Sequence, residues 1–137
     1  MQEKGQEGDR RSEHRETVKR FVDAFDRQDW DKARECLSRD FWAVWPQTRE
    51  RFSRDDFIAM NAAYPGRWRL RLRRYEETPE GAVSVVHVTS EEGGAGHYAT
   101  TFYKFDGDVI RSIEEYWAAE EPAPEWREPF ASPIEKT

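Results

Sequence analysis

The first half of the chain has apolar residues at helical spacing. Between Glu13 and Arg27 they recur at i, i+3, i+4 and i+7, which predicts an amphipathic helix. Two shorter helices are predicted over Trp30–Leu37 and Arg54–Ala63, and Ser53 is placed to cap the last of them. The stretch Phe41–Trp45 is aromatic and is followed by a proline, which is typical of a short strand.

The second half of the chain alternates apolar and polar residues, as strands with one buried face do. The predicted strands are Arg67–Glu76, Val83–Ser90, Gly96–Phe105 and Val109–Trp117. Glycines at 93 and 94, and the Asp106-Gly107 pair, separate the last three as hairpin turns. We therefore predict neighbouring strands of an antiparallel sheet.

Helices followed by a twisted antiparallel sheet form an α+β arrangement. We expect a curved sheet wrapped around the N-terminal helices, giving a cone with a cavity. Residues 12–119 would form one domain. Residues 1–11 are polar and are predicted to be disordered. Residues 120–137 hold four prolines and form a predicted tail, in which Trp126 and Phe130 would pack on the body or on a partner subunit.

Composition excludes several classes of function. The 22 basic and 28 acidic residues give a net charge of −6, which argues against nucleic-acid and membrane-surface binding. No apolar run approaches the ~18 residues of a membrane span, and no signal peptide is evident, so a cytoplasmic protein is expected. The single Cys36 excludes an internal disulfide. We predict no cofactor and no metal.

The strongest chemical signal is Glu115, which shares a strand face with Ile113 and Trp117. A carboxylate on an apolar face is paired, protonated or used in chemistry. If both hairpins are symmetric, His87 is opposite Ala99, and Ala99 is opposite Glu115. His97 would then lie one row away, opposite Trp117. A slip of one residue would break this row.

These three residues are the candidate catalytic set: His87, His97 and Glu115. Histidine titrates near neutral pH, and an apolar wall can raise the pKa of a glutamate, so the set suits general acid–base catalysis. Two histidines and a carboxylate also form an allowed metal ligand set, although nothing in their spacing calls for one. The alternative is structural: Glu115 accepts a hydrogen bond from an Arg, Tyr or Trp, and the histidines are ordinary sheet residues.

The order of these elements resembles the nuclear transport factor 2-like superfamily, over about Ser12–Trp117. The resemblance rests on the helix break at Gln28-Asp29-Trp30, the strand closed by Pro46, the helix ended by Pro65-Gly66, and the final Ile113–Trp117. The superfamily includes steroid delta-isomerases, SnoaL-like polyketide cyclases, scytalone dehydratase and limonene epoxide hydrolase. Because its members carry unrelated activities, the resemblance implies a cone-shaped fold and not a reaction.

The steroid isomerases of this superfamily use one tyrosine and two aspartates. The positions that match them here are Phe21, Trp45 and Thr101. Trp45 cannot take a proton and Phe21 cannot donate a hydrogen bond, so the resemblance argues against steroid isomerisation by that mechanism.

Two hypotheses for the function follow. In the first, the cone binds a small apolar molecule and supports isomerisation, cyclisation, dehydration or hydrolysis, with substrate-binding walls from Trp45, Trp68, Thr101, Tyr103 and Trp117. In the second, the cone is filled by its own aromatic residues, and the protein is a dimerisation or protein-interaction module. An open cavity of at least ~300 Å³ would favour the first hypothesis.

The resemblance also implies a partner. The outer sheet face often meets a second subunit in this superfamily, so we expect a homodimer through an aromatic patch of Tyr98, Phe102 and Tyr116.

Overall fold

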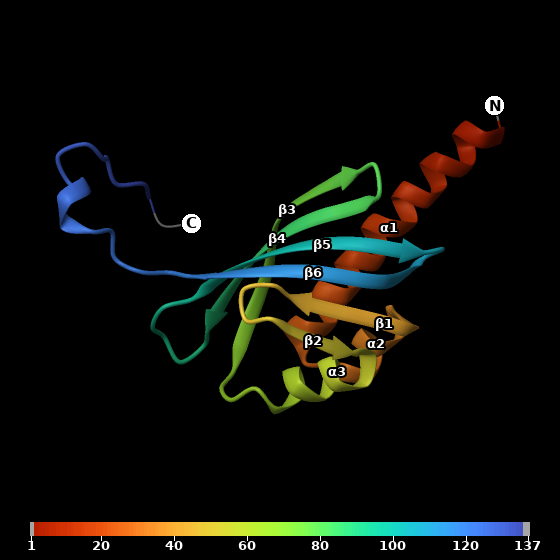
Figure 1. Ribbon diagram of the computed structural model, residues 1–137, viewed down its shortest axis with the longest axis horizontal. Coiled ribbons are helices and arrows are strands. Elements are labelled where there is room, and N and C mark those ends of the chain that lie inside the picture. The colour runs from red at the N-terminus through yellow and green to blue at the C-terminus, as the bar shows by residue number, and fades with distance from the viewer. Residues whose placement is uncertain (1, 136–137) are drawn as a thin grey trace.

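The computed structural model describes residues 2–135, with side chains from residue 10 onward. In this part of the chain, three α-helices lie against one face of a six-stranded sheet (Figure 1). The helices are α1 (Gln2–Arg27), α2 (Trp30–Glu35) and α3 (Arg54–Ala63). The strands are β1 (Leu37–Trp45), β2 (Glu50–Ser53), β3 (Trp68–Thr78), β4 (Gly81–Ser90), β5 (His97–Asp106) and β6 (Val109–Ala119). A single 3-10 turn, η1, spans Glu125–Arg127.

The strand order is β2-β1-β6-β5-β4-β3. Neighbouring strands are antiparallel except for β1 and β6, which pair in parallel. This pair departs from the expected antiparallel sheet because a long crossover joins the two strands, and a crossover permits parallel pairing where a hairpin does not. The α+β class predicted from the sequence is confirmed.

Helix α1 begins earlier than predicted. The sequence predicts a start at Glu13, after a disordered segment of residues 1–11, whereas the backbone of residues 2–11 is helical. Met1 lies outside the described residues. No proline interrupts this stretch, and each of Gly5 and Gly8 costs a helix only about 1 kcal/mol relative to alanine. A helix nucleated by its packed half can therefore extend backwards through the polar residues.

The other element boundaries move by a few residues. Helix α2 ends at Glu35, so β1 begins at Leu37 rather than at Phe41. The stretch after Pro46 forms the short strand β2. The predicted cap is confirmed, because the Ser53 hydroxyl accepts a hydrogen bond from the Asp56 N–H at 3.3 Å.

The core lies between α1 and the concave face of the sheet. Val18 of α1 and Phe41, Ile110 and Ile113 of the strands are at most 2% exposed. The hydroxyl of Thr17 also donates to the carbonyl of Asp108 at 2.6 Å, in the turn between β5 and β6. This packing holds the helix along one side of the cone and leaves the cone open at its other end.

Residues 120–135 extend away from the body after β6 (Figure 1). The side chains of Trp126 and Phe130 are 71% and 84% exposed. The prediction that they pack on the body of the same chain is therefore wrong. Their predicted contact with a partner subunit stays a prediction.

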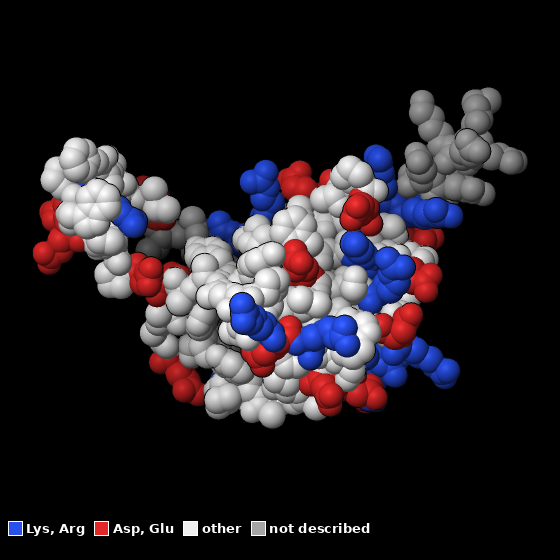
Figure 2. All heavy atoms as spheres, in the orientation of Figure 1, with Lys and Arg blue, Asp and Glu red and all other residues white. Residues whose placement is uncertain are grey.

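Charged residues of both signs are interspersed on the face seen in Figure 2. Phe102 and Tyr116 of the predicted dimer patch are 45% and 41% exposed, and their rings meet edge-on at 6.4 Å. In the described part of the chain, no helix is long and apolar enough to cross a membrane.

Candidate functional site

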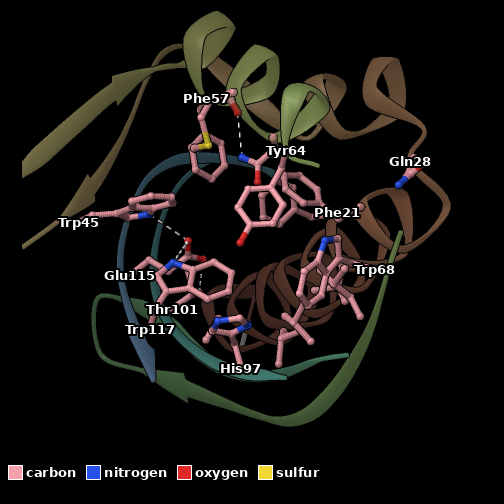
Figure 3. Close-up of a pocket in the computed structure, with 18 of the residues that line it drawn as sticks. Phe21, Gln28, Trp45, Phe57, Tyr64, Trp68, His97, Thr101, Glu115 and Trp117 are labelled. Atoms are coloured by element: carbon pink, nitrogen blue, oxygen red, sulfur yellow. Dashed lines mark hydrogen bonds between the residues drawn. The ribbon is translucent and has the colours of Figure 1, made fainter. Parts of the chain in front are cut away.

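The concave side of the sheet encloses a cavity of about 340 Å³. All three α-helices and five of the strands contribute to its walls (Figure 3). All the predicted site residues except His87 line it, namely Trp45, Trp68, His97, Thr101, Tyr103, Glu115 and Trp117. The other wall residues are mainly aromatic or aliphatic. The cavity is therefore an apolar space with a few polar groups.

The predicted pairing of β4 with β5 is wrong by one residue. Ala99 lies opposite Val86 rather than His87, because the pairing is symmetric about the peptide bond before Gly93 and not about Gly93 itself. A shift of one residue exchanges the two faces of a strand. His87 therefore lies on the outer face, opposite Tyr98, and does not line the cavity.

The predicted pairing of β5 with β6 is wrong by two residues. Glu115 lies opposite Thr101 rather than Ala99, and Trp117 lies opposite Ala99. A register shift between Lys104 and Phe105 accounts for part of the difference. Because a shift of two preserves the face, Glu115 still points into the cavity. The predicted row of His87, Ala99 and Glu115 does not exist.

Glu115 is held by three neutral hydrogen-bond donors. Its Oε1 accepts the indole N–H groups of Trp45 and Trp117, each at 3.1 Å, and its Oε2 accepts the hydroxyl of Thr101 at 2.6 Å. Figure 3 shows the carboxyl group on the cavity wall between these residues. The structural alternative predicted that Glu115 accepts a hydrogen bond from an Arg, Tyr or Trp. Two tryptophans do donate to it.

Burial raises the pKa of the Glu115 carboxyl above its ordinary value. The three hydrogen bonds act in the opposite direction, because they stabilise the charged form, but desolvation is the larger effect. Glu115 is only 8% exposed. Its proton is therefore held more tightly than that of a glutamate in water.

A second hydrogen-bonded group lies beside Glu115. The phenol of Tyr103 is hydrogen-bonded to the hydroxyl of Ser84 at 2.7 Å. Burial raises the pKa of Tyr103 above its ordinary value, so this phenol stays neutral at any working pH. It gives the inner wall a fixed polar group and no charge.

The two predicted histidines are on opposite faces of the sheet. His97 lines the cavity, with its ring 5.8 Å from Trp68 and 6.2 Å from Trp117. His87 instead stacks on Tyr98 at 4.5 Å, and its Nε2 lies 2.8 Å from Oε1 of Glu120. Only His97 is placed to act together with Glu115.

Two cavity residues at helix ends were not predicted from the sequence. Gln28 and Tyr64 follow the ends of α1 and α3 and line the cavity, and Figure 3 shows the Tyr64 hydroxyl pointing into it. Residues at helix ends follow no repeating pattern, so periodicity does not find them. The one feature of the sequence that could have indicated Gln28 and Tyr64 is that each stands just before a predicted turn.

No group of three or more His, Cys, Asp or Glu side chains in the described part of the chain could hold a metal ion. Within the cavity, the polar side chains that a ligand could meet are Glu115, His97, Thr101, Tyr103, and the residues Gln28, Gln47, Thr48, Asn61 and Tyr64.

Solved structures of several other proteins share this fold. A putative ketosteroid isomerase from Kribbella flavida is 22% identical, with a TM-score of 0.78, and the match covers 91% of this chain and 92% of that one. A nuclear transport factor 2-like protein of unknown function from Burkholderia xenovorans is 20% identical, with a TM-score of 0.77 and coverage of 92% and 98%. An epoxide hydrolase from M. tuberculosis is 12% identical, with a TM-score of 0.65 and coverage of 78% and 84%.

The TM-scores establish a shared fold. At identities this low, a shared fold does not establish a shared activity. No curated protein matches the chain. The family model described as a SnoaL-like domain matches residues 18–113. That span runs from the packed half of α1 to the middle of β6 and encloses most of the cavity. The chain therefore belongs to the SnoaL-like domain family, within the nuclear transport factor 2-like superfamily.

Proposed function

We propose that the cavity binds a small, mainly apolar molecule and that Glu115 exchanges a proton with it as a general acid or base. The observation that carries this proposal is the environment of Glu115. Its carboxyl group lies on the wall of an apolar cavity, the three groups that hydrogen-bond to it are neutral donors, and its pKa is raised. A carboxyl whose pKa is raised in this way is suited to proton transfer.

The hydrogen bonds indicate which oxygen carries the proton. A carboxylate oxygen has two lone pairs, and both of those on Oε1 are occupied by the indole N–H groups of Trp45 and Trp117. Among the residues that the structure describes, Oε2 accepts a hydrogen bond from the Thr101 hydroxyl alone. Its second lone pair is the site at which a proton can be taken up or released. Trp45 and Trp117 thus orient the carboxyl group, and Thr101 stabilises its ionised form.

His97 is the second polar group that we assign to the reaction. Its ring lies between the indoles of Trp68 and Trp117 on the same wall as Glu115. From this position it can hydrogen-bond a polar atom of the ligand while Glu115 acts on another. His87 takes no part, because its face of the sheet is turned away from the cavity.

The reaction type stays open among isomerisation, cyclisation, dehydration and hydrolysis. All four need a proton to be moved at an otherwise apolar ligand, which one carboxyl and one imidazole can do. Steroid isomerisation through a base at position 45 is disfavoured, since Trp45 donates its N–H to Glu115.

The competing hypothesis is an interaction module whose cone is filled by its own side chains. A volume of about 340 Å³ exceeds the ~300 Å³ lower end for ligand pockets, which supports a cavity that holds a ligand.

Dimerisation is compatible with both hypotheses. We propose a homodimer through the outer sheet face, supported by the exposed rings of Phe102 and Tyr116, and sedimentation of the wild type against Tyr116→Glu tests it.

The function is tested by a thermal-shift screen with small apolar carbonyl compounds, epoxides and lipids. A ligand that binds the native state raises the melting temperature. We expect a hit whose shift falls in Glu115→Gln and disappears in Ala99→Phe, which places a large ring in the cavity. Glu120→Gln is the matched control, because it makes the same change on a residue outside the cavity lining.

Hits are then assayed for turnover with the wild type and Glu115→Gln, at ligand concentrations that saturate each protein. Loss of turnover in the saturated variant supports proton transfer by Glu115. No hit with the wild type, or hits that Ala99→Phe leaves unchanged, would contradict the proposal and favour the interaction module.

A further inference from the structure

A polar cleft of about 400 Å³ lies beside the mouth of the cavity. Its lining is Asp26, Arg27, Gln28, Arg67, Trp68, Arg69 and Glu91. The cleft and the cavity share two of these residues, Gln28 and Trp68. A molecule that fills the apolar cavity and protrudes past them therefore meets the charged groups of the cleft.

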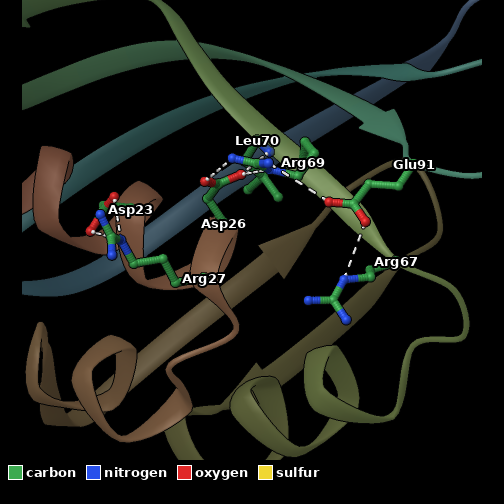
Figure 4. Close-up of polar contacts among 7 residues, drawn as sticks. All are labelled: Asp23, Asp26, Arg27, Arg67, Arg69, Leu70 and Glu91. Carbon is green, nitrogen blue, oxygen red and sulfur yellow. Dashed lines mark hydrogen bonds and ion pairs between the residues drawn. The ribbon is translucent and has the colours of Figure 1, made fainter.

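The three arginines of the cleft differ in how far they are already paired (Figure 4). Arg69 is held by Asp26 through two hydrogen bonds, of 2.9 and 3.0 Å, and the backbone N–H of Leu70 donates to the same carboxylate at 2.8 Å. Its Nη1 also lies 3.7 Å from Glu91. The hydrogen bond from Arg69 keeps the pKa of Asp26 below its ordinary value. This ion pair is a fixed part of the cleft wall.

Arg67 is much less engaged. Its one ion pair among the described residues runs from Nε to Oε2 of Glu91 at 3.2 Å, and its side chain is 72% exposed. The contact is through Nε, and neither terminal nitrogen of the guanidinium group pairs with a residue that the structure describes. Figure 4 shows both of them turned away from Glu91. A guanidinium group in this state can still bind a planar anion with two parallel hydrogen bonds.

Arg27 adds positive charge at the same cleft. It pairs with Asp23 at 3.1 Å, and Asp23 is not part of the cleft lining. The lining contains three guanidinium groups and two carboxylates, and the Asp23 carboxylate beside Arg27 brings the two signs into balance. An anion in the cleft would therefore be bound through the terminal nitrogens of Arg67, and not through a net positive charge.

Gln28 marks the junction of the two spaces. It ends α1 with a left-handed backbone, φ = 59°, and the hydrogen bonds of the helix end run from its N–H to Phe25 and from the N–H of Asp29 to Ala24. Glycine is the usual residue at this position of such a motif, because other residues are strained there. A strained polar residue that borders both spaces is consistent with a role for its amide in binding.

We propose that the ligand is amphipathic: its apolar body occupies the cavity against Glu115, and an anionic head group, a carboxylate or a phosphate, binds Arg67 in the cleft. The Gln28 amide contacts the link between the two parts, and Trp68 separates them. This inference rests on the proposed function, because the same cavity holds the apolar body.

The test compares octanoate, octyl phosphate and 1-octanol by isothermal titration at pH 8, with the wild type, Arg67→Gln and Arg73→Gln. Arg73 is the matched control, an exposed arginine of β3 outside the cleft. We expect both anions to bind the wild type more tightly than the alcohol. Arg67→Gln should weaken the anions about fivefold and change the alcohol by less than twofold. The tighter of the two anions identifies the head group.

Two results would overturn the inference and leave the proposed function intact. One is equal affinity for octanoate, octyl phosphate and 1-octanol. The other is a loss of anion affinity in Arg73→Gln as large as that in Arg67→Gln, which would indicate nonspecific attraction. Binding by none of the three probes would count against the proposed function and against this inference together.

Discussion

Two glutamates near the end of β6 show what the two faces of one sheet do to the same side chain. Glu115 points into the cone, where it is 8% exposed and accepts hydrogen bonds from two indoles and a hydroxyl. Glu120, just past the strand, has a side chain that is 42% exposed and contacts the imidazole of His87 at 2.8 Å. One carboxyl lies in an apolar cavity and the other lies at the rim.

The difference between them is in solvation and in the kind of partner. Neutral donors only partly replace the water that Glu115 has lost, so burial raises its pKa. Glu120 keeps much of its hydration and also accepts the backbone N–H of Gly96 at 3.2 Å. The pair on the outer face has the residue types of an acid–base couple, yet its surroundings suit a structural contact.

The largest loss of stability is expected from a substitution on the inner face of the sheet, which lines the cavity. Trp45→Ala removes a wall of the cavity and a donor to Glu115, and we expect the free energy of unfolding to fall by about 3 kcal/mol. Tyr98→Ala, which removes the ring that stacks on His87, should cost about 1 kcal/mol. Urea unfolding at pH 7 measures both. Equal losses would mean that the two faces contribute alike to stability.

The second prediction tests one hydrogen bond of Glu115. Thr101→Val keeps the shape of the side chain but removes the 2.6 Å contact to Oε2 of Glu115. Because that bond stabilises the ionised carboxyl, its loss should raise the pKa of Glu115 further. We expect a cost of about 2 kcal/mol above that pKa and a smaller cost at acidic pH. A cost that is the same at all pH values would show that Thr101 does not act on the charge.

The third prediction concerns pH. The folded state binds the Glu115 proton more tightly than the unfolded state, so stability should fall as pH rises from the ordinary pKa of a glutamate to the raised pKa in the fold. Below the ordinary pKa of glutamate this loss of stability is absent, and above the raised pKa of Glu115 it is complete. Glu115→Gln should remove this dependence, and unfolding curves across the pH range measure it. A variant that keeps the wild-type slope would contradict the raised pKa.

The smallest effect is expected on the outer face. Glu120→Gln keeps an oxygen that can accept from Gly96, and its side chain is partly exposed, so we expect a change below about 1 kcal/mol. Ligand binding in the cavity should not change. A large loss of stability would indicate that the contact with His87 holds the end of β6 in place.

Much of the site could be predicted because alternation along a strand is a local property. Glu115, Thr101, Tyr103 and His97 line the cavity as expected. The inference for Glu115 and His97 needed only the face on which each lies relative to apolar neighbours in the sequence. The error in the pairing of β5 with β6 did not change which of their residues face the cavity, since a shift of two residues keeps the face.

His87 was misplaced because its position depended on pairing between strands. The hairpin between β4 and β5 is centred half a residue from the predicted point, and that exchanges inner and outer faces along β4. The arginine cleft was missed for a different reason. It brings the end of α1 next to the start of β3 and the end of β4, and residues this far apart have no shared pattern in the sequence.

The sequence by itself determined the element types, their order and the burial of one carboxyl group, because these follow from periodicity, caps and turn residues over short distances. The tertiary structure decided which polar groups share the cavity, which histidine is excluded from it and where a cleft adjoins its mouth. Those outcomes depend on hairpin register and on the docking of α1 against the sheet. A change of one residue in pairing reverses them, at little cost to the local preferences that can be read from the chain.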